Sequence, residues 1–109
     1  MASMNQRVSA GVAMVDDKKP DWPAHVNLDD FDMGYTCECV IGQNYGEYHI
    51  GLQELGISEE AAVALGFIAK PRTGIFASLL VWIEHQFLTL KWARIIRARR
   101  HIGPAGAAV

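Results

Sequence analysis

Cysteine is scarce in this sequence of 109 residues: only Cys37 and Cys39 are present, and one residue separates them. Small secreted domains that cannot bury a large core rely on several disulfide bonds, and two neighbouring cysteines supply no such framework. The cysteine content therefore predicts a protein of a reducing compartment, the cytoplasm.

A long apolar run is also lacking. The most apolar window, residues 75–83, ends at Glu84 and His85, well short of the roughly 20 residues that a helix needs to cross a bilayer. The N-terminus has only a short mixed run from Val8 to Val15, and not the continuous apolar region of a secretory signal. We expect neither a membrane span nor a signal peptide.

Acidic residues are almost absent from the C-terminal part of the chain. Residues 70–109 contain one acidic and seven basic side chains, whereas residues 1–69 contain eleven acidic and three basic side chains. Such an asymmetry either joins two parts of one fold or presents a cationic surface to an anionic partner. The charge pattern alone leaves both interpretations open.

The sequence does have the composition of a folded domain. Half of the residues are apolar and 20% are charged, unlike the weakly hydrophobic, highly charged chains that stay disordered. A chain of this length is typical of one domain with a single core. We predict one domain over residues 1–109, with an acidic part (1–69), a linker (70–74), an apolar and basic helical part (75–100) and a flexible tail (101–109).

Helix signals recur at short intervals and predict a mainly α-helical fold of about five short helices, with a longer, amphipathic and basic helix at the C-terminus. Ser58 is the clearest start, because its hydroxyl can accept a hydrogen bond from a free backbone N–H and two glutamates follow it at the positive end of the helix dipole. Glycine follows three of the predicted helices, where a left-handed cap costs least. The helices are predicted over residues 8–18, 36–44, 47–55 and 58–65. Residues 21–33 are predicted to form an irregular connector held to the core by Trp22, Val26, Leu28, Phe31 and Met33.

The segment from Ile75 to Phe87 is apolar enough to fit a buried helix or a buried strand. We favour a helix because no turn residue occurs before Arg100. Thr89 is a candidate start for the last helix, in which apolar and basic side chains fall on opposite sides of the helical wheel. The apolar side comprises Leu88, Trp92, Ile95 and Ile96, and the basic side comprises Lys91, Arg94, Arg97 and Arg100.

The tract from Cys37 to Tyr48 is the least generic part of the sequence. Its residues Cys39, Val40, Ile41, Gly42, Gln43, Tyr45 and Gly46 fit the pattern C-[VI]-[LI]-G-Q-x-[YF]-G. Trp22, residues 26–33, Gly66-Phe67 and Leu88-Thr89-x-x-Trp92 extend the match. With these features, most of residues 12–100 resemble a set of short uncharacterised proteins from actinobacteria and their phages, although residues 73–86 are longer and more apolar than that pattern. The resemblance implies a phage-encoded protein that acts on a host component, and it implies no particular activity, cofactor or partner.

Packing alone also explains this tract, since Gly42 would permit a close helix crossing and Gly46 a turn. A zinc site on Cys37 and Cys39 would need His25 or His49 as a nitrogen ligand. Structural zinc sites use matched pairs of ligands two to four residues apart, and this spacing does not match. We expect ordinary, partly buried thiols and no metal or cofactor.

Side chains for catalysis are sparse. Asp29, Asp30 and Asp32 lie in a turn-rich connector, where aspartates more often cap turns than form a paired general acid and base. The histidines occur in no nucleophile or metalloprotease motif, and the glycines of the tract lack the lysine of a phosphate loop. We therefore expect a protein that is not an enzyme and has no small-molecule substrate.

Two binding functions remain open. Segment 75–90 has more apolar residues than one helix face can bury in so small a domain, which favours another protein or a second copy as the partner of Phe76, Leu80 and Trp82. The alternative is a sequence-independent nucleic-acid binder whose phosphate contacts come from the basic side of the last helix. We predict the first, a small cytoplasmic interaction or regulatory module that associates with no membrane.

Overall fold

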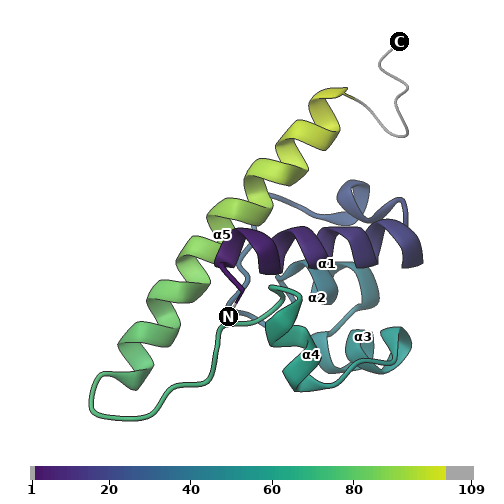
Figure 1. The fold of residues 1–109 in the computed structure, drawn as a ribbon. Helices are drawn as coiled ribbons and strands as arrows, with labels where there is room; N and C mark the ends of the chain where they lie inside the picture. The colour runs from purple at the N-terminus through teal and green to yellow at the C-terminus, as the bar shows by residue number, and fades with distance from the viewer. Residues whose placement is uncertain (1, 103–109) are drawn as a thin grey trace.

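The computed structural model describes residues 2–102, and in this range the chain forms five α-helices, one short 3-10 helix and no strand (Figure 1). The predicted mainly α-helical fold is confirmed. The shorter helices pack as a single globule on one side of a long C-terminal helix, α5, which runs diagonally past them (Figure 1). The elements are α1 (Met4–Lys18), η1 (Trp22–His25), α2 (Val40–Tyr45), α3 (Tyr48–Leu55), α4 (Glu59–Ala64) and α5 (Ala77–Ile102).

Capping groups decide where the first helices begin. Ser3 and Gln6 form a capping box, in which the side chain of each accepts a hydrogen bond from the backbone N–H of the other. This helix therefore begins before the predicted residue 8. The Cys39 sulfur accepts from a backbone N–H in the first turn of α2, so that helix starts later than the predicted residue 36. A serine and a cysteine thus shift two predicted starts in opposite directions.

The glycines that end α2 and α3 were predicted correctly. Gly46 and Gly56 have φ angles of 92° and 70°, a region that glycine enters without the steric cost of a side chain. Gly42 was predicted to permit a close helix crossing, but Gly51 has this role. A Cβ on Gly51 would be 2.1 Å from the Cγ2 of Ile41, so the absence of a side chain at Gly51 lets α3 approach α2. A Cβ on Gly42 would instead meet the preceding loop.

Helix α5 is continuous, and this corrects one prediction. Residues from Ala77 onward are helical, which confirms helix over strand, but Thr89 does not begin a separate helix. The Thr89 hydroxyl donates to the His85 carbonyl oxygen at 2.8 Å and accepts from the Met33 N–H at 2.9 Å. Thr89 therefore joins the connector to the middle of α5. Of the predicted tail 101–109, residues up to Ile102 belong to α5 and the remainder lies outside the described residues.

The core lies between α1, the connector and the C-terminal half of α5. The Trp22 and Trp92 rings meet edge to face with 5.6 Å between centroids, and Phe67 stacks on Trp92 at 5.5 Å. The Trp92 indole N–H donates to the Gly66 carbonyl oxygen at 2.8 Å, so the polar atom of this buried ring is satisfied. As predicted, apolar residues of the connector reach the core, with Trp22 and Val26 fully buried.

A buried ion network fixes the N-terminal half of α5 relative to the globule. The Glu84 carboxylate accepts hydrogen bonds from Arg7 (2.9 Å), Arg72 (2.8 Å) and the Lys70 N–H (2.9 Å). Burial raises the pKa of the Glu84 carboxyl, but these three hydrogen bonds outweigh burial and hold the pKa below its ordinary value. The predicted linker 70–74 is therefore tied to α5 through one carboxylate.

Candidate interaction surface

The side of α5 that faces away from the globule carries exposed apolar side chains. Leu88, Trp92 and Ile96 are fully buried against the core, and residues half a helical turn from them point outward because an α-helix has 3.6 residues per turn. We call the outward-facing apolar set the outer stripe; it comprises Leu80, Ile83, Phe87 and Leu90 of α5 together with Phe76, which lies in the turn just before this helix. Ile83 is half-buried, and the exposed fractions of the other four are 64%, 42%, 53% and 64% in sequence order.

The three residues predicted to bind a partner do not all share this face. Phe76 and Leu80 belong to the outer stripe, whereas Trp82 lies on the neighbouring flank and is 59% exposed. Trp82 lines a cleft of about 460 Å³ together with Tyr35 and Arg72. The structure therefore places Phe76 and Leu80 in the outer stripe and places Trp82 beside a separate cleft.

Sequence analysis missed Phe87 and Leu90 as surface residues. The prediction divided the helix at Thr89, so the apolar residues on the two sides of that position were assigned to separate elements. The signal that could have found them is the alternation of four-residue and three-residue steps through Phe76, Leu80, Ile83, Phe87 and Leu90.

The basic side chains of α5 have different roles in the fold. Arg100 donates to the carbonyl oxygens of Pro23 and Val26, and Lys91 donates to the Asn5 side chain at 2.6 Å. Within residues 2–102, no hydrogen bond or ion pair engages the guanidinium group of Arg94 or Arg97. These two exposed arginines share a groove of about 420 Å³ with Phe87, Leu90 and Lys91, so positive charge continues the outer stripe toward the C-terminus.

One basic residue of the C-terminal part pairs with an acidic residue of the N-terminal part and so stabilises the fold. Arg99 makes two hydrogen bonds of 2.8 Å to the Asp16 carboxylate, which joins α5 to α1. The hydrogen bond from Arg99 holds the pKa of Asp16 below its ordinary value, against the opposing effect of burial, and the Trp22 indole N–H adds a further hydrogen bond at 2.8 Å. Arg99 thus belongs to the fold, whereas Arg94 and Arg97 face solvent.

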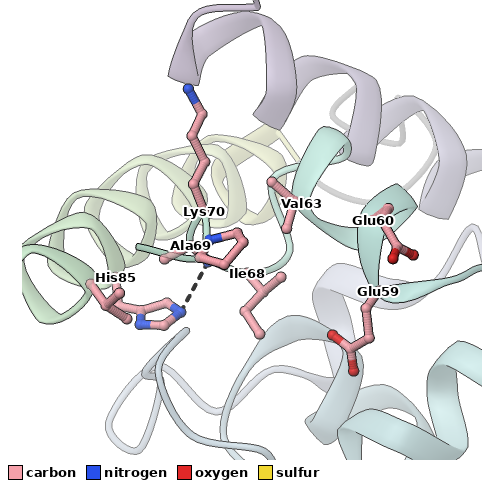
Figure 2. Close-up of a pocket in the computed structure, with 9 residues that line it drawn as sticks. Glu59, Glu60, Val63, Ile68, Ala69, Lys70 and His85 are labelled. Atoms are coloured by element: carbon pink, nitrogen blue, oxygen red, sulfur yellow. Dashed lines mark hydrogen bonds between the residues drawn. The ribbon is translucent and has the colours of Figure 1, made fainter. Parts of the chain in front are cut away.

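A second hollow, of about 480 Å³, lies between α4, the segment after it and α5 (Figure 2). Its walls are mostly apolar and include Val63 and Ile68. The His85 Nε2 accepts from the Ala69 N–H at 3.1 Å, which places the ring proton on Nδ1, and burial lowers the pKa of His85 (Figure 2). Glu59 at its rim accepts from the Tyr48 hydroxyl at 3.0 Å. Because His85 and Glu59 already form hydrogen bonds within the fold, the hollow is better suited to bind an apolar group than to catalyse a reaction.

The two cysteines lie in different environments. Cys37 is exposed, whereas Cys39 is buried, and burial raises the pKa of the Cys39 thiol to about 11. Cys39 is therefore an uncharged thiol at neutral pH and a poor nucleophile. In the part of the chain that the structure describes, no three His, Cys, Asp or Glu side chains are grouped to hold a metal ion.

The acidic connector has turn-forming roles. The Asp32 carboxylate accepts from the Gly34 N–H at 2.8 Å, and Asp30 accepts from the Asn27 side-chain amide at 3.1 Å. These contacts match the predicted role of aspartates in turns. None of the helices between residues 2 and 102 has both the length and the apolar character that a membrane span requires.

Comparisons of the chain with protein-family models, curated proteins and solved structures find no match.

Proposed function

We propose that this protein is a small, non-enzymatic interaction module that binds a protein partner through the outer stripe of α5. The observation that carries the proposal is the exposure of Leu80, Phe87 and Leu90 along one face of α5, and of Phe76 in the turn before it, whereas the opposite face of the helix packs in the core. Covering a large apolar side chain contributes about 1.5–3 kcal/mol. Contiguous exposed apolar surface of this kind marks interaction sites on small proteins.

The fold presents this surface ready for binding. The Glu84 network, beside the stripe, and the Thr89 hydrogen bonds hold α5 against the globule. A partner therefore meets an ordered helix, and little conformational entropy is lost when it binds. We also propose a regulatory role in which the module acts on a host component, as the predicted resemblance to short phage proteins implies.

The test is affinity capture by the tagged full chain from a lysate of its native host, with and without nuclease, at low and high salt. We expect proteins that are retained through both treatments and lost with Phe76→Glu/Leu80→Glu. Ile50→Glu is the matched control, because Ile50 is an apolar residue on α3 with 51% exposure. Loss of all bound material on nuclease treatment or at high salt would contradict a protein partner.

A second candidate function is sequence-independent nucleic-acid binding, favoured by the two exposed arginines on α5 that no hydrogen bond or ion pair engages within residues 2–102. Arg94 and Arg97 could neutralise phosphates, but Arg100 of the predicted basic set is already engaged by backbone carbonyls. Fluorescence anisotropy with a labelled duplex tests this function across a salt series. If it holds, Arg94→Glu/Arg97→Glu abolishes binding, and neutral substitutions lower the salt slope by about 1 for each phosphate contact removed. Under the protein-partner proposal, the charge-reversed protein retains its captured partner.

A further inference from the structure

The outer stripe has the spacing of a coiled-coil seam. Its five residues are separated by alternating steps of four and three, and Arg94 and Arg97 continue the same alternation. This repeat keeps a line of side chains on the contact side of two helices that wind around each other. The spacing therefore fits another long helix better than a flat or irregular surface.

The position of the stripe leaves room for such a helix. The globule packs on one side of α5 only (Figure 1), and the stripe lies on the opposite side. Two copies of α5 could therefore pair through their stripes with the two globules on the outside of the pair.

The charges on the stripe select one orientation. In a parallel pair each seam residue faces its own counterpart, so Arg94 and Arg97 would meet the same arginines of the second copy. In an antiparallel pair, Leu80 of one copy faces Leu90 of the other and Ile83 faces Phe87, while Arg94 lies beside the turn before α5 that contains Phe76. Opposed arginines repel, so the charges favour the antiparallel pair.

We infer that the outer stripe binds the outer stripe of a second copy, which forms an antiparallel, two-fold symmetric dimer. This inference rests on the proposed function, because it names the occupant of the same surface. The stripe is complementary to itself in this orientation: Leu80 meets Leu90, Ile83 meets Phe87, and the arginines of the two copies lie at opposite ends of the pair.

Sedimentation equilibrium of the full chain over a concentration series tests the dimer. We expect the mass to rise from one chain to two, and we expect Phe87→Glu or Leu90→Glu to weaken dimerisation by at least about 100-fold, since each substitution buries a carboxylate twice in the pair. Ile50→Glu should dimerise like the wild type, and circular dichroism checks that each variant folds. A wild-type chain that stays monomeric at every concentration would overturn the inference.

Spin labels test the orientation. In a Cys37→Ser/Ala98→Cys chain the label attaches at the exposed position 98, because Cys39 is buried. At a rise of 1.5 Å per residue the two labels lie about 40 Å apart in the antiparallel pair and about 10 Å apart in a parallel one. Double electron–electron resonance distinguishes these distances, and the short one would overturn the antiparallel arrangement.

The capture experiment separates this inference from the proposed function. A monomeric wild type whose captured host protein is lost with Phe87→Glu would overturn the dimer and leave the interaction module standing. A dimer that Phe87→Glu dissociates, with no host protein captured, would support the second copy as the occupant and remove the host component from the proposal.

Discussion

Glu84 is the only acidic residue between positions 70 and 109, and its carboxylate joins three segments of the fold. Arg7 comes from α1, Lys70 and Arg72 come from the loop before α5, and Glu84 itself lies on α5. Arg7 also donates to the carbonyl oxygens of Val63 and Ile68, so its charge is surrounded by acceptors. Removal of the carboxylate would leave a buried guanidinium group without its counter-charge.

The residue-scale prediction is that Glu84→Gln destabilises the protein by about 3 kcal/mol, because breaking a buried ion pair leaves one charge uncompensated. Urea denaturation at neutral pH measures the change through the midpoint. Glu54→Gln, which removes an exposed carboxylate from α3, is the control. Equal losses in the two variants would show that the Glu84 network contributes no more than a surface charge.

At the scale of an element, α5 is one helix in two environments. Leu88, Trp92 and Ile96 in its C-terminal half are fully buried, whereas the first turns after Ala77 project beyond the core with Leu79 and Leu80 exposed. Local opening of a helix follows the number of buried contacts that hold it. The two halves should therefore differ in stability although the backbone is continuous.

We expect amides of residues 79–83 to exchange hydrogen for deuterium faster than those of residues 92–96, by about tenfold for each 1.4 kcal/mol of difference in opening free energy. Hydrogen-exchange mass spectrometry at low protein concentration makes the measurement. Raising the concentration should slow exchange in residues 79–83 if two stripes pair. Uniform exchange along α5 at low concentration would show that the projecting turns are as stable as the packed ones.

At the scale of the whole molecule, the charge asymmetry has two outcomes. Arg99 joins the acidic and basic parts of the chain through Asp16, which is the first interpretation that the sequence left open. Arg94 and Arg97 remain on the surface, and the second interpretation, a cationic surface for an anionic partner, stays a prediction for them. The basic residues of one helix therefore divide between contacts within the fold and exposure on the surface.

The folded state lowers the pKa of Asp16, so its contribution to stability depends on pH in a defined direction. A lowered folded-state pKa stabilises the protein at pH values above the ordinary pKa of about 4, and this contribution is lost as the pH falls through the folded-state value. The difference in unfolding free energy between wild type and Asp16→Asn should therefore be constant from pH 7 to about 5 and shrink below about 4.

Urea denaturation of both proteins at several pH values measures this difference, and the use of a difference cancels the titration of the histidines. Asp17→Asn removes an exposed carboxylate from the same helix and controls for net charge. A difference that persists at pH 3 would mean that the ionised form of Asp16 does not account for the stabilisation.

Local signals predicted α3 and α4 and the ends of α1 and α2, because a cap acts over one turn, but they missed the caps at Ser3 and Cys39. Ser58 and Gly56 satisfy or terminate backbone hydrogen bonds wherever the rest of the chain lies. The division at Thr89 was wrong for the opposite reason. The change from an apolar to an amphipathic pattern there marks where α5 enters the core, and only the packed structure shows that the backbone continues through it.

The candidate site was predicted in part for a similar reason. An apolar run indicates that side chains are available for burial, so Phe76 and Leu80 were named as contact residues. Which side of the run faces the core depends on Glu84, a charged residue that the pattern alone assigns to solvent and that the structure buries beside Arg7. Phe87 and Leu90 become surface residues only after that choice is made.

By itself the sequence determined the fold class, the helix caps and the surplus of apolar residues near the C-terminus, since each of these depends on neighbours within a few positions. The tertiary structure decided the face of α5 that is exposed, the burial of Glu84 and the division of the arginines between the fold and the surface. Those outcomes depend on partners such as Arg7 and Asp16, which lie 77 and 83 residues from their contacts. Contacts over such distances carry no local pattern.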